Sequence, residues 1–91
     1  MRINCYGVFD TKMAVYRWFR FIPTNEAAIR DFGDSVKDSK TQLHAHPEDF
    51  SIHLLGSIDD ETGLVEPVVP YQVLARGTEF ASVSVDNFEK G

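Results

Sequence analysis

The chain has 91 residues, of which 43% are hydrophobic and 25% charged, a balance typical of a folded domain and not of a disordered segment. This length allows a single domain with one modest hydrophobic core. The formal charge is −5, from 9 Lys and Arg against 14 Asp and Glu. Proteins that coat nucleic acid through its phosphates are normally basic, so the acidic balance argues against such a coat and allows only a local basic patch.

Cysteine content and hydropathy bear on the compartment. Cys5 is the only cysteine, so the chain cannot form an internal disulfide, which suits a reducing compartment. No apolar run approaches the ~18 residues that suggest a membrane span. Asp10 interrupts the early apolar stretch, which argues against a secretory signal. We therefore expect a cytoplasmic protein without a membrane partner.

The first part of the chain predicts a β-hairpin. Residues 2–9 alternate, so that the odd-numbered side chains from Ile3 to Phe9 share one face, as in a strand. A short polar connection leads to VYRWFRFI at residues 15–22, whose many aromatic residues predict the second strand. Pro23 ends this strand, because proline removes a backbone donor from the ladder.

The next segment changes period and predicts a helix over residues 24–38. Apolar residues recur there every three or four positions, which places them on one stripe: Ala28, Ile29, Phe32 and Val36. Thr24 or Asn25 can cap the first turn, and Glu26 lies where the helix dipole favours a carboxylate. We expect the apolar stripe to pack on a sheet.

The second half of the chain predicts another hairpin. Residues 39–49 are polar and are interpreted as a loop, whereas residues 50–58 roughly alternate and predict a third strand. DDETG at residues 59–63 has the chemistry of a turn, because its aspartates can bond to the local backbone and its glycine accepts positive φ. Residues 64–69 predict a fourth strand, which its prolines end or push to a sheet edge.

The C-terminal part is ambiguous. Residues 70–83 contain apolar side chains that suit a short helix, but Gly77 interrupts them, and residues 84–91 resemble a flexible tail. The order is therefore strand, strand, helix, strand, strand and tail, with one domain over residues 1–83. This order predicts an α+β fold, in which one helix packs on one face of a small antiparallel sheet.

Motifs for catalysis or metal binding are weak. His44, His46 and His53 invite a metal site, but such a site needs three or four ligands at suitable spacing, so we favour solvated histidines. The acidic residues at 59–61 lack the spaced ligands of a calcium loop. The sequence has no phosphate-binding glycine loop, nucleophile elbow or zinc signature. We expect no enzymatic activity, no metal and no cofactor.

The segment VYRWFRFI carries the functional question. In a regular strand Tyr16, Trp18 and Arg20 share one face, and Arg17 lies on the other. Three interpretations stay open. One face packs on the helix while its arginine extends to the rim. Alternatively, the aromatic and arginine side chains form a platform on which single-stranded bases stack. They can also form a protein interface, where Trp, Tyr and Arg are enriched.

Several motifs, taken in order, resemble the small nonstructural protein of gokushoviruses, which are single-stranded DNA phages of the Microviridae. The motifs are the opening INCYGVFDTK, AAIRDF at residues 27–32, HPEDFSIHLLG at residues 46–56 and DDETG at residues 59–63. Their order is more specific than any single motif. The resemblance covers about residues 1–65.

The resemblance implies a DNA-binding protein of the host cell cytoplasm that acts in phage DNA replication or in the switch to genome packaging. On this hypothesis the partner is single-stranded DNA, and the candidate binding residues are Tyr16, Arg17, Trp18, Arg20, Arg30 and Lys37. The alternative is an adaptor that binds the phage replication protein or the procapsid with little DNA contact, which the acidic charge favours. Formation of a homodimer would help so small a domain.

Overall fold

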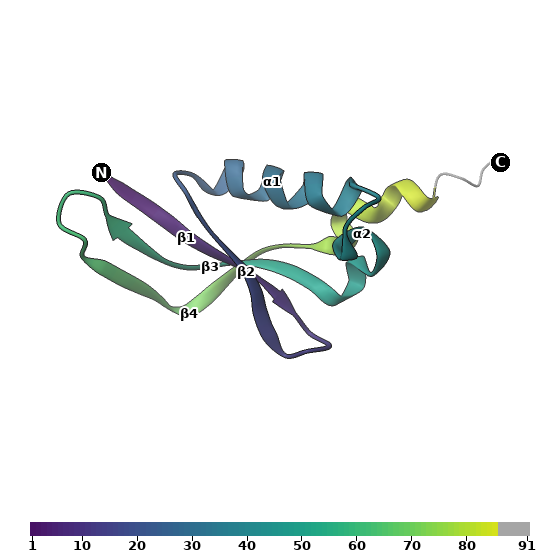
Figure 1. Cartoon of the computed structure of the whole chain (residues 1–91), viewed down its shortest axis with the longest axis horizontal. Coiled ribbons are helices and arrows are strands. Elements are labelled where there is room, and N and C mark those ends of the chain that lie inside the picture. The colour runs from purple at the N-terminus through teal and green to yellow at the C-terminus, as the bar shows by residue number, and fades with distance from the viewer. Residues whose placement is uncertain (86–91) are drawn as a thin grey trace.

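The computed structural model describes residues 1–85, with side chains described as far as Ala81. One antiparallel sheet contains four strands, which are β1 (Arg2–Asp10), β2 (Val15–Ile22), β3 (Phe50–Asp59) and β4 (Val65–Arg76). Their spatial order is β2-β1-β3-β4, so the two hairpins are neighbours and β2 and β4 form the edges of the sheet. The strands of this twisted sheet cross one another in the view of Figure 1, with α1 above them. The predicted α+β fold with two hairpins is confirmed.

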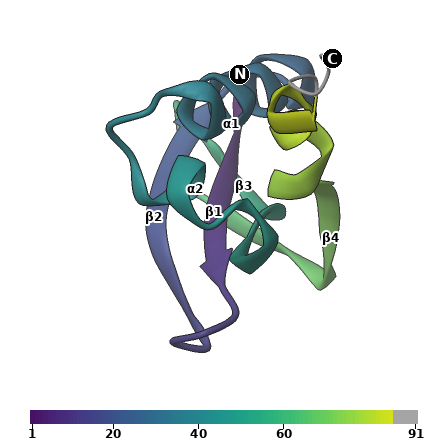
Figure 2. The ribbon, with the colours of Figure 1, turned by 90° about the vertical axis from the view of Figure 1, so that its right-hand side faces the viewer.

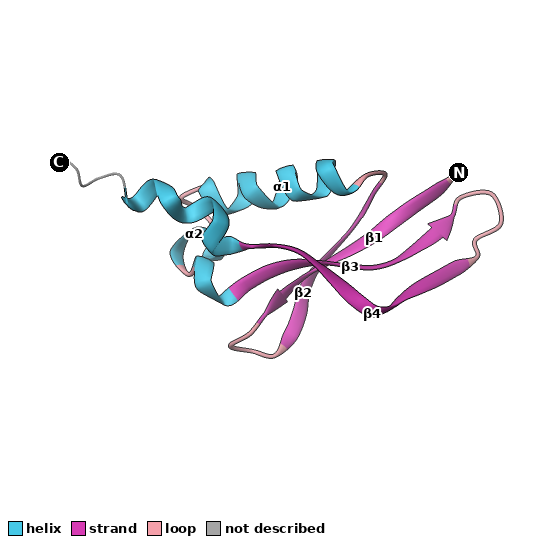
Figure 3. Ribbon diagram, turned by 180° about the vertical axis from the view of Figure 1, so that it is seen from behind, coloured by secondary structure: helices cyan, strands magenta, loops and turns pink. Residues whose placement is uncertain are grey.

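The helices cover one face of this sheet. They are α1 (Asn25–Lys37), α2 (Gln42–Ala45) and the 3-10 helices η1 (Pro47–Asp49) and η2 (Gly77–Val85). Helices α1 and η2 lie side by side over that face, and α2 and η1 close one end of it (Figure 2). Within residues 1–85 no helix lies over the opposite face (Figure 3). None of the described helices has the length and apolar character needed to cross a membrane.

Helix α1 forms where the sequence predicts it and buries the predicted stripe. The Thr24 hydroxyl accepts a hydrogen bond from the backbone N–H of Ala27 at 3.2 Å, which caps the first turn. The Tyr6 hydroxyl donates to Oδ1 of Asn25 at 2.6 Å and so ties β1 to the start of α1. The buried core consists of Tyr6, Ala28, Phe32, Val36, Leu43, Phe50, Ile52 and Ala75.

Two segments differ from the sequence-based interpretation. The loop expected at residues 39–49 contains α2 and η1, because Leu43 is buried in the core and the Thr41 hydroxyl caps α2 by accepting from the N–H of His44 at 3.1 Å. The ambiguous residues 70–83 continue β4 as far as Arg76 and then enter η2. The expected tail at 84–91 begins inside η2, and residues 86–91 lie outside the described part of the chain.

Strand β2 contains a β-bulge at Arg17. Val8 of β1 pairs with Trp18, but the next residue of β1, Phe9, pairs with Tyr16, so Arg17 has no opposite residue. A bulge of this kind inserts one residue into a strand and changes the alternation of its side chains.

The bulge makes the expected distribution of side chains over the two faces of β2 wrong. Arg17, expected on the face opposite Trp18, contacts Asp10 and Gln42 on the side of α1 and α2. Trp18 and Arg20 lie on the face that α1 covers, whereas Tyr16 lies on the opposite face, where its ring centroid is 6.1 Å from that of Phe19. Tyr16 therefore does not share a surface with Trp18 and Arg20. The strict period of two on which that expectation rested holds only for a strand without a bulge.

Gly56 is expected to be required for the close approach of β3 and β4. A Cβ atom at this position would lie 2.6 Å from the carbonyl oxygen of Glu66 and 3.2 Å from Cα of Pro67, and both are backbone atoms. Because backbone atoms cannot rotate away from the new methyl group as a side chain can, Gly56→Ala should lower the free energy of unfolding by about 1–3 kcal/mol. Urea denaturation followed by circular dichroism measures this change.

Gly33→Ala provides the matched comparison. A Cβ atom there would approach the Phe80 ring at 2.8 Å, but that ring belongs to a side chain, which can rotate. Alanine also favours a helix interior by about 1 kcal/mol relative to glycine. Gly33→Ala should therefore cost less stability than Gly56→Ala, and an equal or larger loss at position 33 would contradict this account of the β3–β4 contact.

Candidate functional site

The edge groove is a cavity of about 300 Å³ between β2, α1 and α2, and Trp18 forms one of its walls. Trp18 is 39% exposed, and its ring centroid lies 5.9 Å from that of Phe50. The apolar lining residues are Tyr6, Val8, Trp18, Phe32, Leu43 and Ile52. The polar lining residues are Arg20, Asp31, Ser35, Thr41 and Gln42. The groove thus combines aromatic surface with hydrogen-bonding groups.

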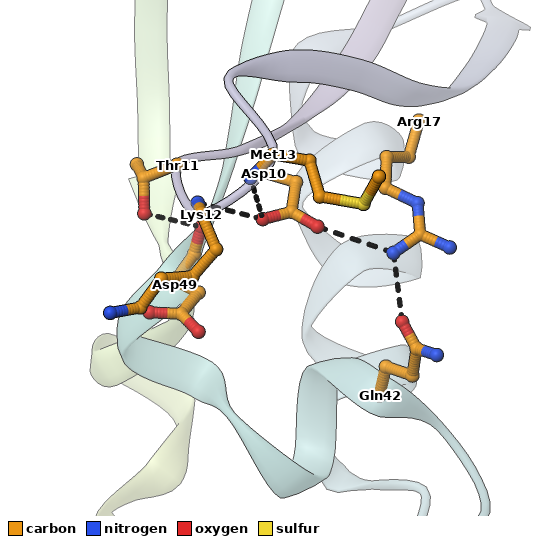
Figure 4. Close-up of polar contacts among 7 residues, drawn as sticks. All are labelled: Asp10, Thr11, Lys12, Met13, Arg17, Gln42 and Asp49. Atoms are coloured by element: carbon orange, nitrogen blue, oxygen red, sulfur yellow. Dashed lines mark hydrogen bonds and ion pairs between the residues drawn. The ribbon is translucent and has the colours of Figure 1, made fainter.

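Arg17 is held over the Trp18 ring by two polar contacts. Its Nη1 donates to Oδ2 of Asp10 at 3.2 Å and to Oε1 of Gln42 at 2.9 Å (Figure 4). These contacts place the guanidinium carbon 4.7 Å from the centroid of the indole, which is within the range of a cation–π interaction. The bulge residue therefore joins the β1–β2 hairpin to α2 and covers part of Trp18.

Asp10 anchors this arrangement from the end of β1. Its side chain is buried, and Oδ1 accepts hydrogen bonds from the backbone N–H groups of Lys12 at 2.9 Å and Met13 at 3.2 Å. Burial opposes the charge of Asp10, but the hydrogen bonds from Met13, Arg17 and Lys12 outweigh it and lower its pKa below the usual value. Asp10 is therefore ionised at neutral pH and pairs with Arg17.

The remaining predicted cations do not all join the groove. Arg20 lines it and forms an ion pair with Asp31, with 3.6 Å between Nη1 and Oδ2. Arg30 is exposed among acidic residues on the outer face of α1. Lys37 lies beside η2, where its Nζ is 5.9 Å from the Phe80 ring centroid. The structure therefore brings Arg17, Trp18 and Arg20 together and leaves Arg30 and Lys37 apart from them.

Tyr16 belongs to a separate cluster on the opposite face of the sheet. Its hydroxyl is 2.8 Å from Nδ1 of His53, whose Nε2 is 2.8 Å from the Ser51 hydroxyl. The His53 ring stacks on Tyr71 with 4.5 Å between centroids, and its centroid is 5.7 Å from that of Phe9. His53 is only 4% exposed, so the prediction of a solvated histidine is wrong there, because aromatic rings enclose it.

The other two histidines are exposed. Nδ1 of His44 lies 3.0 Å from the carbonyl oxygen of Val36. His46, Glu48 and Asp49 each offer one ligand atom, and these atoms all lie within 4.8 Å of one another. Within the described residues this is the group that could hold a metal ion, but three protein donors, of which His46 and Glu48 are exposed, would leave the rest of the coordination sphere to water.

Sequence reasoning missed the contribution of α2 to the groove. Gln42 and Thr41 lie in the segment interpreted as a loop, yet both line the cavity, and Gln42 fixes Arg17. A usable signal existed, because a threonine can cap a helix that begins immediately after it. That signal was weak, because α2 has only four residues.

Comparison with known proteins identifies the family. The family model described as Phage ORF5 protein matches residues 3–80. Protein ORF5 of Chlamydia phage 1 is 39% identical over 72 residues, which cover 75% of each chain. No solved structure gives a significant match. The chain belongs to the Phage ORF5 protein family, and the resemblance to the small nonstructural proteins of gokushoviruses is confirmed.

The stability of the protein is expected to fall on mild acidification because of His53. Burial lowers the pKa of His53 below its ordinary value of 6.5, and the charge of Arg76 lowers it further. The unfolded chain therefore takes up a proton as the pH falls through about 6.5, while the folded chain does not. Between pH 7.5 and 5.5 the free energy of unfolding should decrease, by at most about 1.4 kcal/mol per pH unit.

Two variants separate this effect from general acid destabilisation. His53→Gln removes the buried ring and should flatten the pH dependence, although its stability at pH 7.5 should be lower. His46→Gln removes an exposed histidine and should keep the wild-type slope. A wild-type slope in His53→Gln would contradict the assignment. Urea denaturation at each pH provides the measurement.

Proposed function

We propose that this protein binds single-stranded DNA through the edge groove and acts in phage DNA replication or in the switch to genome packaging. One observation carries the binding proposal: the single tryptophan of the chain is partly exposed beside a cavity of about 300 Å³, with two arginines next to it. The role in replication or packaging is supported by the resemblance to gokushovirus nonstructural proteins.

The groove suits a base better than a phosphate. Arg17 lies over the indole, and the exposed part of Trp18 borders the cavity, so a flat ring can stack against it. Stacking of a base on an aromatic side chain contributes about 1–3 kcal/mol and depends little on sequence. The Ser35 hydroxyl donates to the carbonyl of Asp31 and can still accept a hydrogen bond, and the Gln42 amide nitrogen can donate one, so these two groups can contact the edge of the base.

Electrostatics should contribute little to this binding. Arg17 pairs with Asp10 and Arg20 pairs with Asp31, so each cation has a carboxylate partner, and the whole chain carries a charge of −5. For a protein that binds single strands, a plot of log K against log salt concentration has a slope of about −0.7 for each phosphate contact. With two arginines, the slope should not be steeper than about −1.4. So shallow a salt dependence favours a protein that binds exposed single strands weakly and transiently over one that coats them.

A second candidate function is that of an adaptor for the phage replication protein or the procapsid. The observation that favours it is the position of Trp18 on β2, which is an edge strand of the sheet. Edge strands can accept a strand from a partner, and Trp and Arg are enriched in the residues that dominate protein interfaces. The groove would then hold an apolar side chain of the partner instead of a base.

Fluorescence of Trp18 gives a direct test of DNA binding. Titration of the wild-type protein with an oligothymidylate at low salt should change the emission of this single tryptophan in a saturable way. In a parallel anisotropy titration with labelled oligothymidylate, Trp18→Ala should weaken binding by about 1–3 kcal/mol, because the stacking surface is lost. Arg20→Ala should make the salt slope shallower by at most about 0.7, because Arg20 is already paired with Asp31.

Lys37→Ala is the matched control. It also removes one exposed cation, but that cation lies beside η2 and not at the groove, so the affinity should stay within about twofold of wild type. Absence of DNA binding by the wild-type protein at low salt would rule out the first function. Equal losses in Lys37→Ala and Arg20→Ala would mean that the binding depends on overall charge and not on the groove.

A further inference from the structure

The open face is the face of the sheet opposite α1, and it is apolar. An antiparallel sheet with one covered face normally carries polar side chains on the other. Here five apolar side chains of that face are between 39% and 65% exposed: Phe19, Phe21, Val65, Tyr71 and Val73. Scattered exposed apolar residues are ordinary, but a contiguous group on one face is typical of an interaction surface.

The open face also contains a shallow hollow. Its volume is about 190 Å³, and its lining residues are almost entirely apolar: Cys5, Phe21, Leu55, Ile58, Val65 and Pro67. Phe21, which lines the hollow, and Phe19 of the same strand are both more than half exposed. Protruding rings and a hollow therefore occur on the same surface, which is what a self-complementary contact requires.

Charged groups are nearly absent from the open face. In the described strands the pairing places the carboxylates of Asp10, Asp59 and Glu66 on the face of α1, and Arg76, at the end of β4, is the charged residue of the open face. His53 is buried with a lowered pKa and adds no charge at neutral pH. Such a surface cannot neutralise the phosphates of a nucleic acid, so its chemistry indicates a protein partner.

We infer that the open face is covered by a second copy of this chain, sheet against sheet, in a twofold-symmetric dimer. Interfaces between different proteins usually carry charged and polar groups that select the partner, whereas homodimer interfaces are more apolar and depleted of charge. In a twofold dimer each copy presents the same surface, so the exposed rings of Phe19 and Phe21 lie toward the hollow of the other copy. Packed sheets lie about 10 Å apart.

The available area is consistent with a stable dimer. An aromatic side chain can bury about 150–250 Å², so the exposed parts of the five apolar side chains above offer on the order of 500 Å² per copy. A standard interface buries about 800 Å² per partner, and the partly exposed side chains around the hollow contribute to the remainder. Each copy has a charge of −5, but this face-to-face contact keeps the carboxylates of the strands on the outside.

This inference is independent of the proposed function, because the edge groove lies on the face covered by α1. Sedimentation equilibrium of the wild-type protein at about 10–100 µM should give twice the chain mass of 10.3 kDa. Phe21→Glu places a carboxylate in the contact twice, once from each copy, and should weaken the dimer by on the order of 100-fold or more. A second variant, Val65→Glu, should have the same effect.

Met13→Glu is the matched control for these variants. Met13 is 61% exposed, close to the 62% of Phe21, but it lies at the tip of the β1–β2 hairpin beside Arg17 (Figure 4). This variant should remain a dimer. A wild-type protein that stays at the monomer mass at 100 µM would overturn the inference, as would folded Phe21→Glu and Val65→Glu proteins that remain dimeric. Circular dichroism establishes that each variant is folded.

A measurement on the wild-type chain needs no substitution. Cys5, the single thiol, lines the hollow and is partly accessible in the single chain. Its reaction with an excess of a disulfide reagent should slow about tenfold as the protein concentration rises from about 1 to 100 µM, because the second copy covers it. A rate that stays constant over a concentration range in which sedimentation shows the dimer to dissociate would overturn the inference. Phe21→Glu should bind oligothymidylate with wild-type affinity. Loss of the dimer can therefore be distinguished from loss of DNA binding at the groove.

Discussion

The packing of α1 on the central strands is the contact on which the rest of the molecule depends. Phe32 and Val36 of the helix join Tyr6 of β1 and Ile52 of β3 in the core. An α-helix is only about 10–12 Å wide, whereas strands are spaced about 4.8 Å apart, so one helix covers little more than two of the four strands. The groove beside the edge strand β2 is a consequence of this limit. The opposite face is uncovered because all the described helices lie on the face of α1.

The sequence predicted those features that depend on neighbouring residues. The alternation of residues 2–9, the apolar stripe of α1 and the aspartate-glycine turn at 59–63 are local signals, and each one is present in the structure. Helix α2, the bulge in β2 and the length of β4 depend on pairing register and tertiary packing. A single sequence carries little information on these, because a short capped segment or a strand with proline suits more than one environment.

The candidate site was predictable only in part for the same reason. The density of aromatic and arginine residues drew attention to Arg17, Trp18 and Arg20, which the structure brings together. Their partners come from other parts of the chain, since Gln42 lies 25 residues after Arg17, and no local pattern connects the two. Burial of His53 has the same origin, because the stacked ring of Tyr71 belongs to a neighbouring strand.

The bulge at Arg17 has a consequence for how β2 is constructed. Val8 and Phe9 are consecutive residues of β1, and they pair with Trp18 and Tyr16 of β2. In a strand without Arg17 the hydrogen-bond ladder would therefore be continuous, with every other residue in its present pair and on its present face. Pairing of β2 with β1 therefore does not require Arg17. Arg17 is the extra residue of the bulge, its contribution lies in its side chain, and the sheet accommodates the guanidinium group through one local irregularity of its backbone.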